Sequence, residues 1–370
     1  MFGRLSVRQH VLELLTTRLQ LVQQWDSIPE IQAQEIRRPI FITGMPRSGS
    51  TFLHSLLGQD PANRAPQVWE AMFPYRVLGQ EQSKTSSLIN KTENKLRWFR
   101  WLAPKFDAIH PISATLSQEC IAILSYTFYS DEFVTMFRVP SYEKWLRRQD
   151  MSGAYGFHKC FLKHLQWHDP MKRWVLKSPD HVYGLEALFK IYPDACVIHM
   201  HRDPLKVLAS TASLTAVLQG AFSKRIDMFE IGAHEVLALN NLLQRGMAFR
   251  DGHAELKDQF LDVHYLEFIR DPVATVRTIY QHFGWRLTTV AEERMRAFLS
   301  AWPREQLRNH AYDLADFGLN RINTDRLFEP YRDRFAIQCE PRASGPIDKG
   351  PLPEAAEGCI PKKWHNPLSH

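Results

Sequence analysis

Cysteine is scarce in this sequence, and the spacing of the cysteines excludes the usual cysteine-based sites. The 370 residues include five cysteines, and none of them forms the C-x-x-C pattern that is typical of zinc sites and redox-active dithiols. An odd and sparse set is typical of a reducing compartment. The cysteines thus give little support for a zinc or redox-pair site, and we expect a cytoplasmic protein.

Long apolar runs and blocks of like charge are also absent. No apolar run approaches the roughly 20 residues of a membrane span, and no apolar segment follows the charged residues 1–8 as it would in a signal peptide. Lysine and arginine outnumber aspartate and glutamate, 46 against 40, but they are spread along the chain. This mild excess suits a small anionic ligand and gives no support for nucleic acid as a partner.

The sequence does contain an alternation of strand and helix patterns. Short apolar runs predict strands, which are expected at residues 40–43, 174–177, 196–201 and 260–265. A helical pattern follows each strand, at residues 50–57, 183–192, from 204 onward and at 272–283. The alternation predicts an α/β fold, a P-loop-like parallel β-sheet flanked by helices.

Further helices are expected around this sheet. Four apolar residues near the N-terminus recur at helical spacing and predict a helix laid on the domain at about residues 5–25. These four are Leu12, Leu15, Leu19 and Val22. The aromatic-rich residues 62–160 predict a helical region that covers the substrate. We expect one domain over residues 1–370, with its core at about 37–335 and a loosely held tail at 340–370.

A glycine-rich turn follows the first expected strand. The segment from Gly44 to Thr51, "GMPRSGST", matches the phosphate-loop pattern G-x-x-x-x-G-K-[ST], except that Ser50 replaces the lysine. Two glycines allow a tight turn whose N–H groups, with the next helix N-terminus, can bind an anion. Arg47 adds a cation that can fork onto two oxygens. The alternative is an ordinary strand–turn–helix with incidental glycines.

The missing lysine bears on which anion the loop holds. A nucleoside triphosphatase uses that lysine on its phosphates and needs an acid to hold magnesium. The available acids are poor candidates, because Asp262 lies on an expected strand and Asp203 caps an expected helix. A terminal sulfonate carries one negative charge and needs fewer cations. A phosphate-loop kinase or triphosphatase, and a non-catalytic nucleotide-binding module on the same fold, remain rival hypotheses.

Three motifs in order carry a resemblance to a known family. "GMPRSGSTFLHSLL", "WVLKSPDHVYGLEALFKIYP" and "VIHMHRDPLKVLASTASL" resemble the sulfotransferases that use 3′-phosphoadenosine 5′-phosphosulfate (PAPS), and so do "IYQHFGW" and "DFGLN". The loop is similar to the P-R-S-G-[ST]-[ST] form of a bacterial branch that also resembles the tyrosylprotein sulfotransferases. The resemblance covers about residues 37–335. It implies transfer of a sulfonate group from PAPS to an acceptor hydroxyl, with no metal required.

The resemblance also implies which residues bind the cofactor. In that family the loop grips the 5′-phosphosulfate, at the positions of Arg47, Ser48, Gly49, Ser50 and Thr51. Arg202 and Ser210 match the site for the 3′-phosphate, and Tyr265 resembles a tyrosine that touches the cofactor. Each has an ordinary alternative: a surface salt bridge for Arg202, a helix serine for Ser210 and a core position for Tyr265.

Catalytic roles follow from the same resemblance. Lys177 matches a lysine that stabilises charge on the bridging oxygen as the sulfur–oxygen bond breaks, and Arg47 is expected to meet that charge as well. The general base is left between two residues. Glu70 in "APQVWEAMFP" matches a glutamate of related enzymes, whereas His181 in "KSPDH" is the alternative because many cytosolic sulfotransferases use a histidine. Each of the three also has an ordinary alternative. Lys177 could be a solvated lysine at a strand end, Glu70 an exposed acid at a helix start, and His181 a neighbour of a helix cap.

The acceptor and the oligomeric state do not follow from the sequence. The aromatic residues between 69 and 145 could line an apolar pocket for a small or lipid-like alcohol or phenol, or they could form helix core. A peptide tyrosine and a carbohydrate stay open as acceptors.

Overall fold

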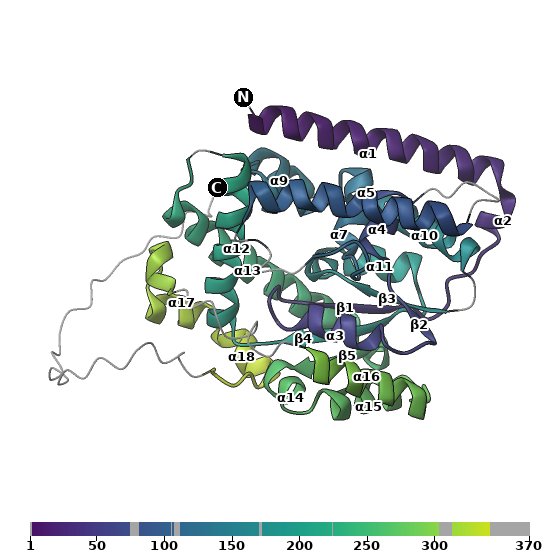
Figure 1. Ribbon diagram of the computed structural model, residues 1–370. Coiled ribbons are helices and arrows are strands. Elements are labelled where there is room, and N and C mark those ends of the chain that lie inside the picture. The colour runs from purple at the N-terminus through teal and green to yellow at the C-terminus, as the bar shows by residue number, and fades with distance from the viewer. Residues whose placement is uncertain are drawn as a thin grey trace, which may run out of the picture. The chain divides into compact units, whose positions relative to one another are not determined.

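A parallel sheet of five strands forms the centre of the protein. The computed structural model describes residues 2–74, 81–104, 106, 112–169, 172–223, 225–302 and 313–340. The strand order is β2-β3-β1-β4-β5, and all neighbours run parallel. The strands are β1 (Ile40–Gly44), β2 (Asn63–Arg64), β3 (Arg173–Lys177), β4 (Cys196–His201) and β5 (Phe260–His264). The predicted parallel α/β fold is confirmed (Figure 1), and the short β2 is the strand that the sequence did not predict.

Helices cover both faces of the sheet, because alternate strand residues point to opposite sides and both sets are apolar. Phe41 and Val197 pack on the side of α10 (Ser152–His168) and α11 (Leu185–Ile191). Their strand neighbours pack on the opposite side, against α3 (Ser50–Leu57), α15 (Pro272–His282) and α16 (Thr289–Ala301). Both faces of β1, β3 and β4 are therefore buried.

The remaining elements follow in chain order. At the N-terminus lie α1 (Phe2–Ser27) and α2 (Pro29–Gln32). Between β2 and β3 lie α4 (Val68–Met72), α5 (Glu81–Leu102), α7 (Cys120–Leu124), η1 (Ser125–Thr127), α8 (Glu132–Met136) and α9 (Pro140–Leu146). After β3 come η2 (Pro179–Gly184), α12 (Pro204–Phe222), α13 (Met228–Gly252), η3 (Ala254–Gln259), α14 (Tyr265–Arg270), η5 (Leu314–Phe317), α17 (Arg321–Leu327) and α18 (Glu329–Phe335). The expected tail, apart from Glu340, lies outside the described residues.

Helix α1 is present where the sequence predicted it, but it packs on the protein through a different stripe of side chains. Leu14, Leu21 and Trp25 are buried, whereas the leucines of the predicted repeat are exposed, Leu12 by 47% and Leu19 by 72%. At about 100° per residue, Leu12 and Leu14 lie on opposite sides of the helix. The helical period was therefore visible in the sequence, whereas the side that faces the core was not.

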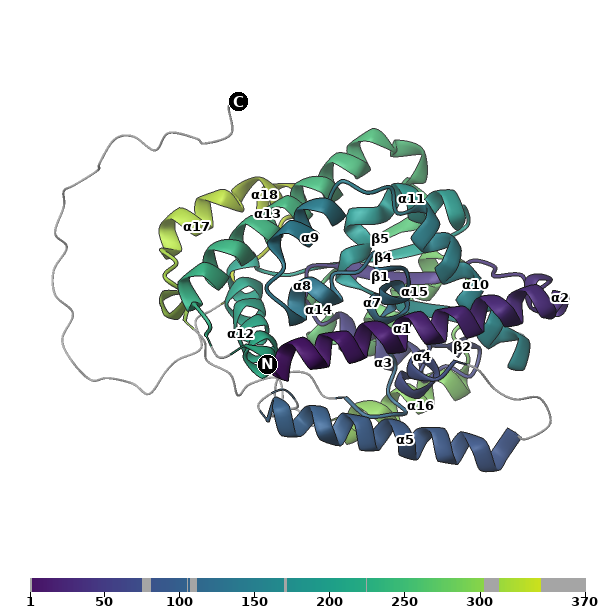
Figure 2. The same cartoon turned by 90° about the horizontal axis from the view of Figure 1, so that it is seen from above.

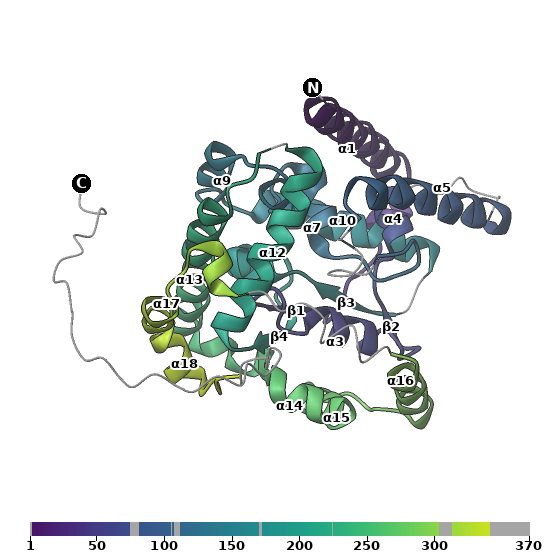
Figure 3. The same ribbon diagram turned by 60° about the vertical axis from the view of Figure 1, so that its left-hand side comes forward.

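Helix α12 is the described helix whose length and composition would allow it to cross a membrane. Nearly half of it is buried within the protein, and it packs against α13 through Val207, Leu208 and Leu242. Figure 3 shows α12 and α13 beside the ends of β1 and β4. Such burial is expected of a core helix that positions residues beside the ends of the central strands.

Candidate functional site

The loop between β1 and α3 turns on two glycines with left-handed backbone angles. The φ angle is +119° at Gly44 and +87° at Gly49. A Cβ atom on Gly44 would lie 2.3 Å from the Met200 carbonyl oxygen, and one on Gly49 would lie 2.9 Å from the Tyr265 ring. Any side chain would collide there, so glycine is required for the close approach of the loop to β4 and α14. The loop leads directly into the N-terminus of α3, whose free N–H groups attract anions.

Three predicted residues from separate elements meet at this loop. Arg47 Nε donates a hydrogen bond of 3.0 Å to Ser210 Oγ on α12. Arg202, which follows β4, donates from Nη1 to the Arg47 carbonyl oxygen at 2.8 Å. The loop, the end of β4 and the first half of α12 therefore converge on one basic corner.

Tyr265 reaches the same corner from an element other than the predicted one. We expected it at the end of a strand, but β5 ends at His264 and Tyr265 is the first residue of α14. Its ring centre lies 3.8 Å from the guanidinium carbon of Arg202. The tyrosine face thus supports the planar guanidinium through a cation–π contact.

An acidic side chain from the C-terminal part of the chain binds Arg202. Glu340 accepts hydrogen bonds from Arg202 Nε at 2.6 Å and from Nη2 at 2.8 Å. The backbone N–H of Glu340 donates to Asp203 at 3.0 Å. Two parallel bonds from a guanidinium to a carboxylate have the geometry that a phosphate would also accept. Glu340 therefore holds a position on Arg202 that an anionic ligand could take.

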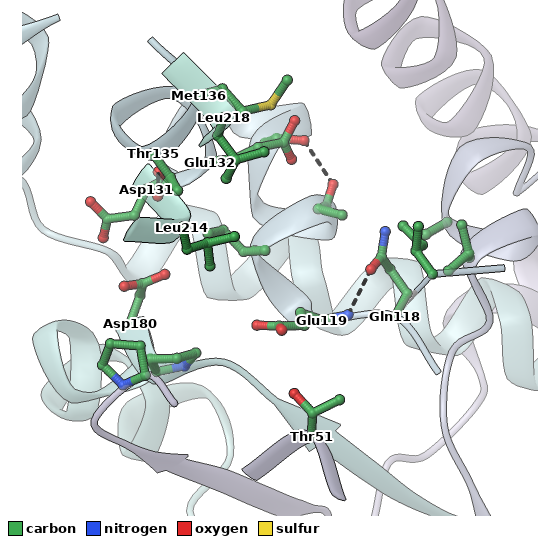
Figure 4. Close-up of a pocket in the computed structure, with 18 of the residues that line it drawn as sticks. Thr51, Gln118, Glu119, Asp131, Glu132, Thr135, Met136, Asp180, Leu214 and Leu218 are labelled. Carbon is green, nitrogen blue, oxygen red and sulfur yellow. Dashed lines mark hydrogen bonds between the residues drawn. The ribbon is translucent and has the colours of Figure 1, made fainter. Parts of the chain in front are cut away.

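Lys177 is buried at the end of β3 and pairs with an acid that the sequence had not indicated. Its side chain is 3% exposed, and its ammonium group forms a short ion pair with Glu119, which caps α7. Both residues line a cavity of about 1350 Å³, together with Arg47, Thr51 and Arg202. In Figure 4, Thr51, Glu119 and Asp180 point toward one common space. A cation and a carboxylate thus lie in the same wall as the phosphate-type loop.

The cavity walls away from the loop are largely apolar. The lining residues belong largely to α1, α5, α7, α8 and α12. Figure 1 shows α1 and α5 above the sheet, and Figure 2 views the same helices from above. The apolar lining includes Leu12, Leu14, Leu96, Phe99, Leu102, Leu214 and Leu218. A space of this kind can hold an extended apolar molecule.

One further part of the wall is acidic. Asp180 lines the cavity, and burial, followed by the charge of Asp131, raises its pKa well above the usual value. Arg147 donates a hydrogen bond of 2.7 Å to Asp131. The raised pKa favours the protonated form of Asp180, in which the carboxyl group donates a hydrogen bond.

The two residues proposed as the base lie apart from this wall. Glu70 accepts from Arg64 at 2.7 Å and from the backbone N–H of Gln67 at 3.0 Å, and it lines a separate cavity of about 590 Å³. His181 is fully buried, bonds to the Tyr155 hydroxyl at 2.7 Å, and has a pKa lowered well below its usual value by burial. The structure brings neither of them among the residues that line the large cavity.

Glu119 and Asp180 were missed because nothing local marks them. Glu119 lies in "LSQEC", which belongs to no motif, and it reaches Lys177 over 58 residues of chain. Asp180 lies inside the quoted "KSPDH", but its raised pKa depends on burial and on Asp131 from another element. The predicted loop residue Ser48 is fully buried. Its hydroxyl donates to the Met45 carbonyl oxygen at 2.6 Å and so stabilises the loop itself.

A group of possible metal ligands lies between β4 and β5. The ligand atoms of His199, His201 and Asp262 are within 4.8 Å of one another. His201 bonds through one ring nitrogen to Asp262 at 2.8 Å and through the other to Tyr331 at 2.6 Å, while Arg250 donates twice to Asp262. The acid that a magnesium-dependent triphosphatase would need is thus engaged by a histidine and an arginine.

Comparisons with known proteins agree on one family. A model described as "Sulfotransferase family" matches residues 39–289. Omega-hydroxy-beta-dihydromenaquinone-9 sulfotransferase Stf3 is 26% identical over 275 residues, both in Mycobacterium bovis and in Mycobacterium tuberculosis. The match covers 71% of this chain and 66% of those proteins' length, so the chain spans just under two thirds of these curated relatives.

Two solved structures match most of the chain. The crystal structure of sulfotransferase STF1 from Mycobacterium tuberculosis H37Rv has 32% sequence identity and a TM-score of 0.77, and the match covers 90% of this chain and 86% of that one. Sulfotransferase STF9 from Mycobacterium avium has 29% identity and a TM-score of 0.83, with 92% and 88% covered.

The environment of Glu70 predicts a contribution to stability. Glu70→Ala removes the nearer carboxylate from Arg64, which is 9% exposed and keeps Asp169 at 3.7 Å. The loss should lower the free energy of unfolding by about 2 kcal/mol. The control is Glu230→Ala, because Glu230 pairs with Arg138 on the surface and should cost less than about 1 kcal/mol. Urea denaturation measures both. Equal effects of the two substitutions would contradict the structural role of Glu70.

Proposed function

The chain belongs to the sulfotransferase family, as its motifs predicted, and we propose that it transfers a sulfonate group from PAPS to a hydroxyl of a lipid-like alcohol or phenol. The observation that best supports this is the basic corner at the loop, where Arg47 bonds to Ser210 and Arg202 bonds to the Arg47 backbone. One loop and one adjacent arginine–serine pair suit a ligand with phosphate groups at two positions. PAPS has that pattern, whereas ATP carries all its phosphates in one chain.

The donor is proposed to lie along the loop, with its two ends recognised separately. The N–H groups at the start of α3, with the hydroxyls of Ser50 and Thr51, would bind the 5′-phosphosulfate. Arg202 and Ser210 would bind the 3′-phosphate, with Tyr265 supporting the arginine. Ser50 in place of a lysine fits this donor, since the terminal sulfonate carries less charge than a triphosphate tail.

The proposed reaction is an in-line transfer. The acceptor oxygen attacks sulfur, a new sulfur–oxygen bond forms, and the bond from sulfur to the bridging phosphate oxygen breaks. Charge that develops on that leaving oxygen is stabilised by Lys177 and Arg47. The acceptor proton goes to a carboxylate, for which Glu119 is our proposal, because it lines the cavity and touches Lys177. Glu70 and His181 are the alternatives that the same experiments test.

The proposed acceptor class follows from the apolar part of the cavity. The wall formed by α1, α5 and α12 offers leucine and phenylalanine side chains over a space of about 1350 Å³, which suits an extended apolar alcohol better than a carbohydrate. The two curated relatives are named for omega-hydroxy-beta-dihydromenaquinone-9, which supports a lipid-like alcohol here.

Ligand-induced stabilisation tests the donor. Adenosine 3′,5′-bisphosphate, the product of PAPS, should raise the melting temperature, whereas ATP with magnesium should raise it less, because the second phosphate site is unused. Transfer of labelled sulfonate from PAPS to a panel of alcohols and phenols then tests the reaction. Preferential stabilisation by ATP with magnesium would favour a kinase or triphosphatase. Binding of the bisphosphate without product on any alcohol class would favour a non-catalytic module.

Substitution of Glu119 tests the proposed base. Glu119→Gln keeps the shape but cannot accept the acceptor proton, so turnover should fall at least about 100-fold, with little change in affinity for adenosine 3′,5′-bisphosphate. Steady-state kinetics and calorimetry give the two quantities. Glu70→Gln and His181→Asn are the matched controls and should keep turnover within a few-fold. Normal turnover in Glu119→Gln, with loss in one of the controls, would assign the base to that control residue.

Glu340 should compete with the donor for Arg202. Glu340→Gln removes the carboxylate charge from Arg202, so affinity for adenosine 3′,5′-bisphosphate should rise about tenfold. Glu329→Gln removes an equal charge from an exposed position on α18 and controls for the change in net charge. Titration calorimetry compares the two variants. If the affinity of Glu340→Gln rises no more than that of Glu329→Gln, Glu340 does not compete with the donor.

A further inference from the structure

The outward side of α1 carries apolar side chains that no part of the described chain covers. A surface helix normally places polar residues on this side. Here the stripe consists of Leu5, Leu12, Leu15, Leu19 and Val22, which are between 39% and 72% exposed. The opposite side of α1 is also apolar and packs on the core through Leu14, Leu21 and Trp25. One apolar side of α1 packs on the core, and the other side is left exposed to solvent.

Two tryptophans on α5, the helix paired with α1, are exposed as well. Trp98 is 68% exposed and Trp101 is 71% exposed, and their rings meet edge to face at 5.9 Å. Helix α5 is joined to α1 by the ion pair of Lys95 and Glu13 at 2.8 Å, and Figure 2 shows the two helices diverging from one end. We call the five stripe residues together with Trp98 and Trp101 the docking surface.

The docking surface is continuous with the large cavity. Leu12 and Trp98 belong to it, and both also line the cavity, although their side chains are 47% and 68% exposed. A residue that lines a cavity and is also exposed lies at an opening. The cavity therefore has an opening near Leu12 and Trp98, and the docking surface borders that opening.

We propose that the docking surface binds a lipid bilayer with anionic headgroups, so that a lipid-like acceptor passes from the bilayer into the cavity through that opening. Tryptophan side chains favour the boundary between headgroups and acyl chains. Exposed arginines on the same two helices suit the headgroup charge, namely Arg4, Arg8 and Arg18 on α1 and Arg97 on α5. The inference rests on the proposed function, because it assumes a lipid-like acceptor.

The position of Arg8 favours a bilayer over a second copy of the chain. Arg8 lies on the stripe itself, one turn from both Leu5 and Leu12. In a seam between two α1 helices its guanidinium would enter an apolar contact. At a bilayer, the long side chain can instead extend to the phosphate groups while its methylenes stay among the apolar residues.

Vesicle binding by the full-length protein tests the docking surface. Sedimentation with phosphatidylcholine vesicles, with and without phosphatidylglycerol, should show binding that is stronger with phosphatidylglycerol and weaker at high salt. The variant Leu19→Ser with Trp101→Ser should bind at least about tenfold more weakly, since both residues lie outside the cavity lining. The control is Leu237→Ser with Ile322→Ser, whose side chains are exposed by 69% and 65% but lie on α13 and α17; it should bind normally.

Activity assays separate this inference from the proposed function. The Leu19→Ser, Trp101→Ser variant should lose about tenfold in transfer to a lipid alcohol held in vesicles, while transfer to a water-soluble phenol stays unchanged. If the unmodified protein sulfonates the soluble phenol but binds neither kind of vesicle, the docking surface is wrong and the proposed function stands. If it binds vesicles but transfers no sulfonate to any acceptor, the proposed function fails. A dimer that the double variant dissociates, with no vesicle binding, would assign the surface to a second copy.

Discussion

The close approach of the β1–α3 loop to β4 is the constraint on which the rest of the site depends. Gly44 has no room for a side chain against the Met200 carbonyl, and its left-handed backbone is suited to glycine. Because the loop lies against β4, the residue that follows the strand, Arg202, reaches the Arg47 carbonyl. The same approach brings α12 near enough for Ser210 to accept from Arg47. One tight turn thus assembles a corner from three elements.

A buried ion pair supplies the second element of the site. Lys177 is nearly inaccessible, and a buried ammonium is unfavourable unless a partner compensates its lost hydration. Glu119 provides that partner, and it also ties the end of β3 to α7. In the proposed reaction the two groups have separate roles, one toward the leaving oxygen and one toward the acceptor proton. Donor binding would weaken their mutual attraction by offering Lys177 a second anion.

The helices outside the sheet shape the part of the cavity that faces the acceptor. Helices α1, α5 and α12 supply apolar walls, and the outward sides of α1 and α5 are apolar as well. An apolar path from the surface to the loop is what a lipid-like molecule requires, since its hydroxyl must reach the sulfonate while its chain stays out of water. The exposed apolar surface of α1 and α5 and the apolar cavity would thus serve the same proposed reaction.

Local patterns determined most of the fold. Apolar runs predicted the four longer strands, and their alternation with helices predicted the parallel sheet. Gly44 and Gly49 predicted the tight turn between β1 and α3, because the backbone angles of a turn depend on neighbouring residues. The motifs predicted the family, which the comparisons confirmed.

Contacts between distant parts of the chain were decided only by tertiary packing. Examples are Arg47 with Ser210, 163 residues apart, and Lys177 with Glu119, 58 residues apart. Packing also placed Glu70 and His181 away from the cavity lining and turned the leucine repeat of α1 outward. Helical period and side-chain type are properties of neighbours in sequence, whereas burial and partnership depend on which other elements fill the surrounding space.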